Sequence, residues 1–315
     1  MKKTFFLLCG IIIILLIFSC SRNVPHGAEP GVKFGVTDEI LVYHTWLSLK
    51  EMEYREPLSP KLLNNSAAGL SGKANIPQDF FPWAGITSHH ILAHHYLDAW
   101  FSQLAQIRNP QRFYIISPDH YGISLEPYSL TIGCWKSGFG IVESDREKVF
   151  ELAQSLGVEL DMGVFAPEHG ISALMPYIKK YFPQAKVIAI VHRSEPAVNT
   201  FLSGGLAGIL ENEFDEAGKQ ENFLIISSDF SHGGNMQETC NYDFNSQRYL
   251  KDSRNVSWNS VCCDNRAGIY ILDRLGKNNL ESCILYHTNS WEISNQGKDD
   301  ITSYFFVYFA DLYTH

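Results

Sequence analysis

The sequence predicts an α/β protein, a three-layer αβα sandwich in which helices cover both faces of a central sheet that is mostly parallel or mixed. Apolar strand-like runs alternate with amphipathic helical patterns along residues 83–275, which is typical of a sheet with crossover helices. The last two strand-like runs have no clear helical pattern between them, which favours a mixed sheet over a purely parallel one.

The helices and strands are expected where apolar residues recur at the matching spacing. Residues 90–107 carry apolar side chains at helical spacing. A helix over 145–156 is indicated by Ser144 and Asp145 before Glu147, the pattern of an N-cap followed by an acidic first turn. The remaining expected helices cover residues 171–181, 197–210, 242–251 and 265–275. The remaining expected strands, beside those that end at histidines, cover residues 39–44, 186–191, 283–287 and 303–309.

The N-terminal residues form a targeting segment. Lys2 and Lys3 precede an apolar run over residues 5–18, which is too short to span a bilayer comfortably, since that takes about 20 residues. The run ends in Ile17-Phe18-Ser19-Cys20, which resembles a bacterial lipobox. That resemblance implies cleavage before Cys20 and diacylation of its thiol; an ordinary signal peptide is the alternative.

Three segments follow from this organisation. Residues 1–20 are expected to be a lipoprotein signal peptide, residues 21–38 a polar tether, and residues 39–315 a single α/β domain, because about 295 residues are enough for one sizeable core. The expected location is the bacterial cell envelope, at the outer membrane or the periplasmic face, with the lipid on Cys20 as the contact with the membrane.

Charge and cysteine content exclude some functions. The chain has 25 Lys and Arg against 34 Asp and Glu and no basic cluster, which argues against nucleic-acid binding. The odd number of cysteines after Cys20 leaves at least one thiol free or metal-bound within a chain. No two are spaced as Cys-x-x-Cys, which argues against a zinc ribbon. These cysteines are Cys134, Cys240, Cys262, Cys263 and Cys283.

Three apolar strands run directly into histidines. Residues 83–88 lead to His89, residues 113–119 lead to His120, and residues 223–231 lead to His232. Ligands of open α/β sheets bind beyond the carboxyl ends of the strands, so these imidazoles are expected to converge on one pocket. Such a set suits a metal site or an acid–base site. A structural, hydrogen-bonded histidine is the alternative at each strand end.

Further polar residues flank these segments. Asp229 lies three residues before His232. Glu168-His169 directly precedes the helix expected over residues 171–181. A carboxylate and an imidazole at the start of a helix can orient a substrate or a partner histidine. His90 and His94 lie four residues apart, as two zinc ligands would, but no glutamate follows His90 as in zinc proteases. A polar helix face is therefore the preferred interpretation of that pair.

Several motifs together resemble those of a known family. Ser117-Pro118-Asp119-His120-Tyr121 is similar to its Gly-Pro-Ser-His-His, and Glu168-His169-Gly170-Ile171-Ser172 to its Glu-His-Ser-Ile-Glu. Ser227-Ser228-Asp229-Phe230-Ser231-His232 matches nearly residue for residue. The chain thus resembles the Memo family, the B component of the AmmeMemoRadiSam set, which is related in fold to class III extradiol dioxygenases. Order and spacing agree from about residue 83 to 310.

The resemblance implies a metal site of two histidines and a cysteine, associated in that family with iron or copper. Carried over, the ligands are His89, His120 and Cys262, with Cys263 as the alternative to Cys262. Such a donor set suits Fe, Cu or Zn. The resemblance also places His232 in the catalytic pocket as the acid–base residue. It places Asp229, Glu168 and His169 in the lining of that pocket.

Departures from the family pattern leave two functions open. The residues around His89 differ from the family motif. An alternative alignment places the motif on residues 82–86, with Trp83, which cannot bind a metal, at the position of the motif histidine. Cys-Gly-Arg of the family reads Cys262-Cys263-Asp264 here. The first function is metal-dependent redox or dioxygenase-like chemistry on an unknown small substrate. The alternative is a lipoprotein that binds metal or a ligand without turnover; a pocket with only a structural role is a third interpretation.

Overall fold

The computed structural model describes residues 41–44, 76–193 and 197–312. The expected signal peptide, tether and lipidated Cys20 lie outside these ranges. All of these described residues belong to one compact unit. Within the described ranges, no helix is long and apolar enough to cross a membrane.

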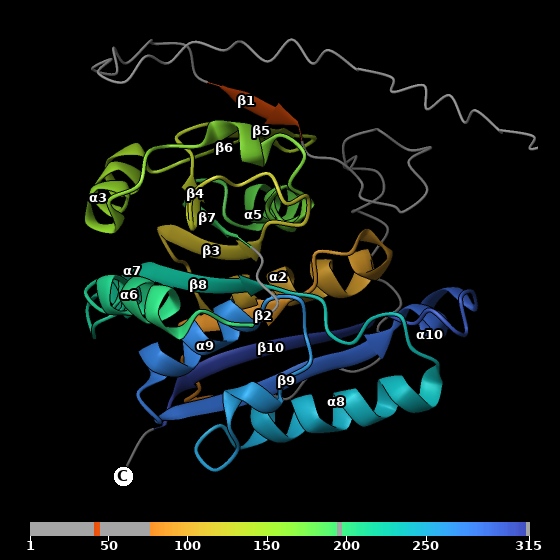
Figure 1. The fold of residues 1–315 in the computed structure, drawn as a ribbon. Helices are drawn as coiled ribbons and strands as arrows, with labels where there is room; N and C mark the ends of the chain where they lie inside the picture. The colour runs from red at the N-terminus through yellow and green to blue at the C-terminus, as the bar shows by residue number, and fades with distance from the viewer. Residues whose placement is uncertain (1–40, 45–75, 194–196, 313–315) are drawn as a thin grey trace, which may run out of the picture. The chain divides into compact units, whose positions relative to one another are not determined.

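A mixed sheet of seven strands forms the centre of the fold (Figure 1). Its order is β4-β7-β3-β8-β2-β10-β9. Four neighbouring strands are parallel: β7 (Lys186–His192), β3 (Arg112–Pro118), β8 (Asn222–Ser227) and β2 (Ala84–Thr87). The strands beside them pair antiparallel: β4 (Tyr128–Leu130), β10 (Ser303–Asp311) and β9 (Leu280–Asn289). The expected α/β class and mixed sheet are confirmed.

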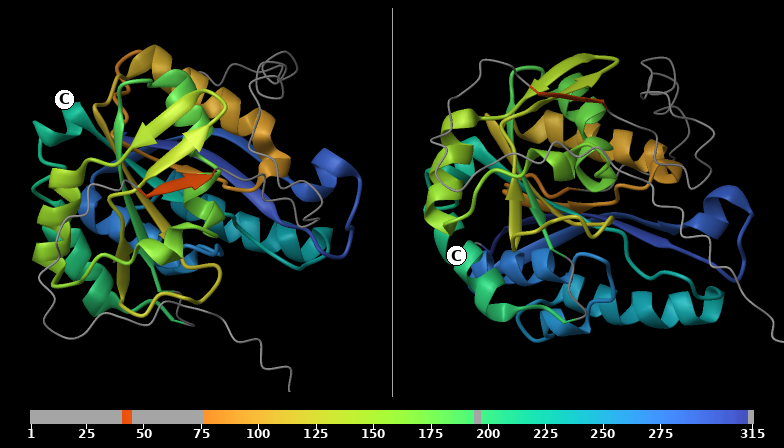
Figure 2. Two further views of the ribbon diagram at one scale, coloured as in Figure 1. Left: turned by 90° about the horizontal axis from the view of Figure 1, so that it is seen from above. Right: turned by 45° about the horizontal axis from the view of Figure 1, so that its top comes forward.

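Helices cover both faces of the sheet (Figure 2). Successive strand residues enter opposite layers: Ile115 packs in one apolar core and Ile116 in the other, as the alternation of side chains along a strand requires. The first core is closed by α2 (His94–Ile107) and α5 (Met175–Tyr181). The second is closed by α3 (Arg146–Leu156), α6 (Thr200–Leu210), α8 (Met236–Lys251) and α9 (Arg266–Gly276).

Shorter elements complete the fold. A separate three-stranded sheet, which the sequence did not predict beyond its first strand, joins β1 (Val42–His44), β5 (Cys134–Ser137) and β6 (Gly140–Glu143). The 3₁₀ helices are η2 (Ile91–Ala93), η3 (Met162–Phe165) and η4 (Trp258–Ser260). The short α-helices are α4 (His169–Ser172), α7 (Gly218–Glu221) and α10 (Ser290–Ser294).

Two expected helices are interrupted. The helix expected over residues 90–107 begins as η2, because His90 has extended backbone angles and its Nδ1 accepts a hydrogen bond from the N–H of Leu92. The helix expected over residues 171–181 divides into α4 and α5, and Pro176 lies in the first turn of α5, where its missing N–H is not needed. Both interruptions lie next to histidines of the site.

We expect Gly85→Ala to destabilise the fold by about 1–3 kcal/mol, the usual cost of overpacking. A Cβ at Gly85 would lie 2.5 Å from a ring carbon of Trp100 and 2.8 Å from the backbone oxygen of Val307. Gly205→Ala, in the exposed middle of α6 with open space around it, is the matched control and should stabilise by up to about 1 kcal/mol. Urea denaturation measures both; equal effects would contradict the packing described.

Candidate metal centre

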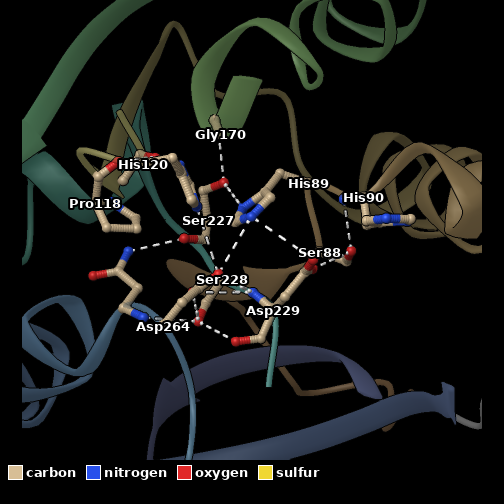
Figure 3. A network of polar contacts seen from close by, with 12 residues as sticks. Ser88, His89, His90, Pro118, His120, Gly170, Ser227, Ser228, Asp229 and Asp264 are labelled. Atoms are coloured by element: carbon tan, nitrogen blue, oxygen red, sulfur yellow. Dashed lines mark hydrogen bonds and ion pairs between the residues drawn. The ribbon is translucent and has the colours of Figure 1, made fainter. Parts of the chain in front are cut away.

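The centre lies beyond the carboxyl ends of the parallel strands. β2 and β3 both pair with β8 in parallel, so the loops after all three strands emerge at one edge of the sheet. His89 follows β2, His120 follows β3, and Ser227 ends β8. Figure 3 shows these side chains turned toward one another, with Asp264 joining them from the segment before α9.

His89 is buried and its ring orientation is fixed. Its Nδ1 lies 3.0 Å from Oγ of Ser227, and that hydroxyl donates its own proton to the carbonyl of Gly170 at 2.5 Å. Ser227 can therefore only accept from His89, which places a proton on Nδ1. Nε2 then faces two carboxylates, 3.4 Å from Oδ2 of Asp264 and 3.7 Å from Oδ2 of Asp229.

His120 is oriented by Glu168, whose carboxylate is fully buried. Nδ1 of His120 lies 2.7 Å from Oε1 of Glu168, and the backbone N–H of His120 donates to Oε2 at 3.0 Å. The ring thus carries its proton on Nδ1 and directs Nε2 to Asp264, 3.6 Å from Oδ2. A carboxylate behind the ring of a ligating histidine is the usual support of a metal site.

His169 supplies a third imidazole. Its ring centre lies 4.1 Å from that of His120 and 5.1 Å from that of His89. Gly170 allows this approach: a Cβ there would collide with Oγ of Ser117 and lie 3.0 Å from Cε1 of His120. The glycine in the Glu168-His169-Gly170 segment is thus explained by the close packing of the centre.

Donor atoms converge in two overlapping groups. Ligand atoms of His89, His120 and His169 lie within 4.8 Å of one another, and so do those of His89, Asp229 and Asp264. Among the described residues, Nε2 of His120 and Nδ1 of His169 are buried without a hydrogen-bond partner. Buried nitrogens facing a carboxylate fit a divalent transition metal, because imidazole and carboxylate are its common ligands. The described residues thus include a His/His/Asp group that could hold a divalent metal.

The structure brings together five of the residues expected from the sequence and separates two. His89, His120, Glu168, His169 and Asp229 lie in or against the groups. His232 is exposed and belongs to neither group. Cys262 is half-buried and also belongs to neither; its N–H donates to Oγ of Ser246 at 3.0 Å.

Asp264 was not expected as a ligand. Its carboxylate accepts from Oγ of Ser228 at 2.8 Å and from the N–H of Asp229 at 3.2 Å, and its own N–H donates to the carbonyl of Asp229 at 3.0 Å. The sequence predicts a ligand in this segment, but at Cys262 and not at Asp264. The signal that was present is the carboxylate directly after Cys262-Cys263, where the family pattern has an arginine.

His192 was also missed, although it follows the same rule as His89 and His120, since it ends β7. It is buried, and its Nε2 lies 2.9 Å from Oδ1 of Asn265. Nδ2 of Asn265 donates to the carbonyls of Ile116 and Ser227, so Oδ1 is the acceptor. His192 therefore carries its proton on Nε2.

The charges of the centre are strongly coupled. Burial lowers the pKa of His120, but the nearby carboxylates of Asp264 and Glu168 outweigh burial and raise it to about 10. Burial also lowers the pKa of His89, but the charges of Asp229 and Asp264 outweigh burial. The pKa of His89 is therefore raised. Burial and the charges of His89 and His120 lower the pKa of His169 to about 2. Near pH 7, His120 is thus protonated and His169 neutral.

Asp264 remains ionised in this setting. Burial would raise the pKa of its carboxyl group, but the charges and hydrogen bonds of His89 and His120 hold it well below its usual range. An anionic carboxylate between two imidazoles is available both as an ion-pair partner and as a metal ligand.

Comparison with protein families gives a match over the part of the chain that contains the donor groups. The family model described as "Memo-like protein" matches residues 81–269, which include all members of both donor groups. The chain belongs to the Memo family. The family resemblance expected from the motifs is therefore confirmed, and the fold of this Memo protein is the α/β fold described above.

Individual Memo relatives are distant. A MEMO1 family protein of Pyrobaculum aerophilum is 29% identical over 198 residues, 62% of this chain and 63% of that protein. One of Pyrobaculum arsenaticum is 31% identical over 137 residues, 42% of this chain and 47% of that protein. One of Methanopyrus kandleri is 26% identical over 206 residues, 64% of this chain and 66% of that protein. The matched part thus spans about half to two thirds of these relatives.

Binding of Zn²⁺ should release at least one proton at pH 7, because a metal must displace the proton that the raised pKa keeps on His120. The apparent affinity should therefore rise about tenfold per pH unit between pH 6 and 8 for each proton displaced. Calorimetry in buffers of different ionisation enthalpy measures the protons. His95→Gln, an exposed histidine outside both groups, is the control; Zn²⁺ binding with no proton release would contradict the charge assignment.

Proposed function

We propose that this Memo protein is a metal-dependent enzyme that performs redox or dioxygenase-like chemistry on a small molecule, with Fe(II) held by His89, His120 and Asp264. The observation that carries the proposal is the Asp264 carboxylate, 3.4 Å and 3.6 Å from the two Nε2 atoms. Two histidines and one carboxylate with open positions form the set that non-haem Fe(II) enzymes use. Bound there, iron would supply one-electron and dioxygen chemistry.

The other residues of the centre have separable roles in this proposal. Glu168 keeps the proton of His120 on Nδ1 and so leaves Nε2 for coordination. Ser227 does the same for His89. Neutral His169 offers a lone pair to a further coordination position or to a substrate hydroxyl. Asp229 accepts a hydrogen bond from Oγ of Ser88 at 2.5 Å, which holds its carboxylate beside Nε2 of His89.

His232 as the acid–base residue stays a prediction from the family motif. In the described structure it is exposed, and no contact joins it to the donor groups. Cys262 as the third ligand also stays a prediction. We favour Asp264, because its carboxylate already approaches both imidazoles while the Cys262 thiol lies in neither donor group.

Asp264→Asn should weaken Fe(II) binding by more than about 100-fold, since the loss of an outer-shell partner alone costs about 10–100-fold. Cys262→Ser is the matched control and should bind Fe(II) as the wild type does. Anaerobic titration followed by metal analysis measures both. Loss of iron in Cys262→Ser with retention in Asp264→Asn would reverse the assignment.

A binding protein without turnover is the second candidate, favoured by the altered residues around His89. The two candidates differ in one observation. With Fe(II) supplied, an enzyme of the proposed kind should consume dioxygen over many turnovers in the presence of a small oxidisable molecule such as a catechol, and Asp264→Asn should not. Fe(II) binding without dioxygen consumption above that of free iron would support the binding protein instead.

We further propose that the protein is anchored to the bacterial envelope by lipid on Cys20, on the strength of the lipobox-like Ile17-Phe18-Ser19-Cys20. Wild-type protein expressed in a bacterium should enter the detergent phase of a Triton X-114 extraction. Cys20→Ala should stay in the aqueous phase or remain unprocessed, while Cys240→Ala, an exposed cysteine of α8, should behave as the wild type. Equal partitioning of wild type and Cys20→Ala would contradict the anchor.

A further inference from the structure

A cavity of about 200 Å³ lies next to Asp264, between the end of β7 and the first turns of α6 and α9. We propose that it binds an organic anion, a carboxylate or a phosphate monoester with a short apolar body, and that Arg266 is the residue that reads the anionic group. Its role as the substrate site rests on the proposed function; its capacity to bind anions does not.

The cavity and the metal centre share a wall. Asp264 lines the cavity and also approaches His89 and His120. A molecule held in the cavity would therefore touch the carboxylate that coordinates the metal. Since none of the residues in the donor groups other than Asp264 lines the cavity, the cavity is a neighbouring subsite and not the centre itself.

Two arginines give the cavity its character. Arg193 and Arg266 both line it. Nη2 of Arg266 donates to Asn259, but its Nε is buried without a hydrogen-bond partner among the described residues. A buried guanidinium N–H that lacks an acceptor is costly. An anion in the cavity would provide the acceptor for Nε through a charge-assisted hydrogen bond.

The remaining charges favour an anion as well. Asp264 is the one acidic residue among the described residues that line the cavity, against two arginines. His192 is neutral, because burial lowers its pKa. The first turns of α6 and α9, each eleven residues long, add the positive end of their dipoles to the two guanidinium charges.

Apolar side chains next to the cavity indicate the rest of the ligand. Pro127, Val198 and Leu202 line it together with the ring of Tyr128. An anion with a short aliphatic body matches these side chains.

The test uses octanoate, octyl phosphate and the neutral 1-octanol as probes of the full chain, with and without bound Zn²⁺, in calorimetric titrations. Both anions should bind the wild type, and 1-octanol at least tenfold more weakly. Arg266→Gln should weaken the anions at least tenfold and Arg266→Lys less. Arg254→Gln, an exposed arginine outside the cavity, is the matched control and should change nothing.

A second variant keeps the test independent of the fold around Arg266. Ala267→Leu narrows the cavity while both arginines remain, and it should also abolish binding of octanoate. Anion binding that survives Arg266→Gln, that appears only with Zn²⁺ regardless of Arg266, or that is absent from the wild type would overturn the inference. If Arg266-dependent binding is found in a chain that takes up no metal, the anion site stands and the proposed function fails.

Discussion

The carboxylate of Asp264 is the interaction on which the site depends. It faces Nε2 of both His89 and His120, holds the pKa of His120 high and forms one wall of the neighbouring cavity. Without it, two imidazoles whose ring centres lie 4.6 Å apart would lose the one carboxylate that approaches both Nε2 atoms. Asp229 would remain beside His89 and Glu168 behind His120, and the mutual repulsion of the protonated rings would be less strongly opposed.

The parallel strands explain why residues so distant in sequence meet. β2, β8 and β3 end at one edge of the sheet, and each delivers a histidine or a serine there. The supporting contacts come from Glu168, at the start of α4, behind His120, and from Ser227, at the end of β8, behind His89. Both supports fix the proton on Nδ1, so the two Nε2 atoms are directed at one point by the backbone topology and by two hydrogen bonds.

Much of this was visible in the sequence. Apolar periodicity gave the helices and strands of the sandwich, and histidines at strand ends marked His89 and His120. Asp264 and the exposed position of His232 could not be read in this way, because they depend on how one loop turns: the N–H of Asp264 pairs with the carbonyl of Asp229, which brings the carboxylate, and not the Cys262 thiol, to the imidazoles. The conformation of a single loop produces no periodic pattern of apolar residues in the sequence.

X-ray absorption spectroscopy of the Zn²⁺-loaded protein distinguishes the kinds of atom bound to the metal and so tests whether Asp264 or Cys262 is the third ligand. We expect nitrogen and oxygen neighbours alone, at about 2.0–2.2 Å, from two imidazoles and the carboxylate of Asp264. A sulfur neighbour at about 2.3 Å that disappears in Cys262→Ser and persists in Asp264→Asn would contradict it.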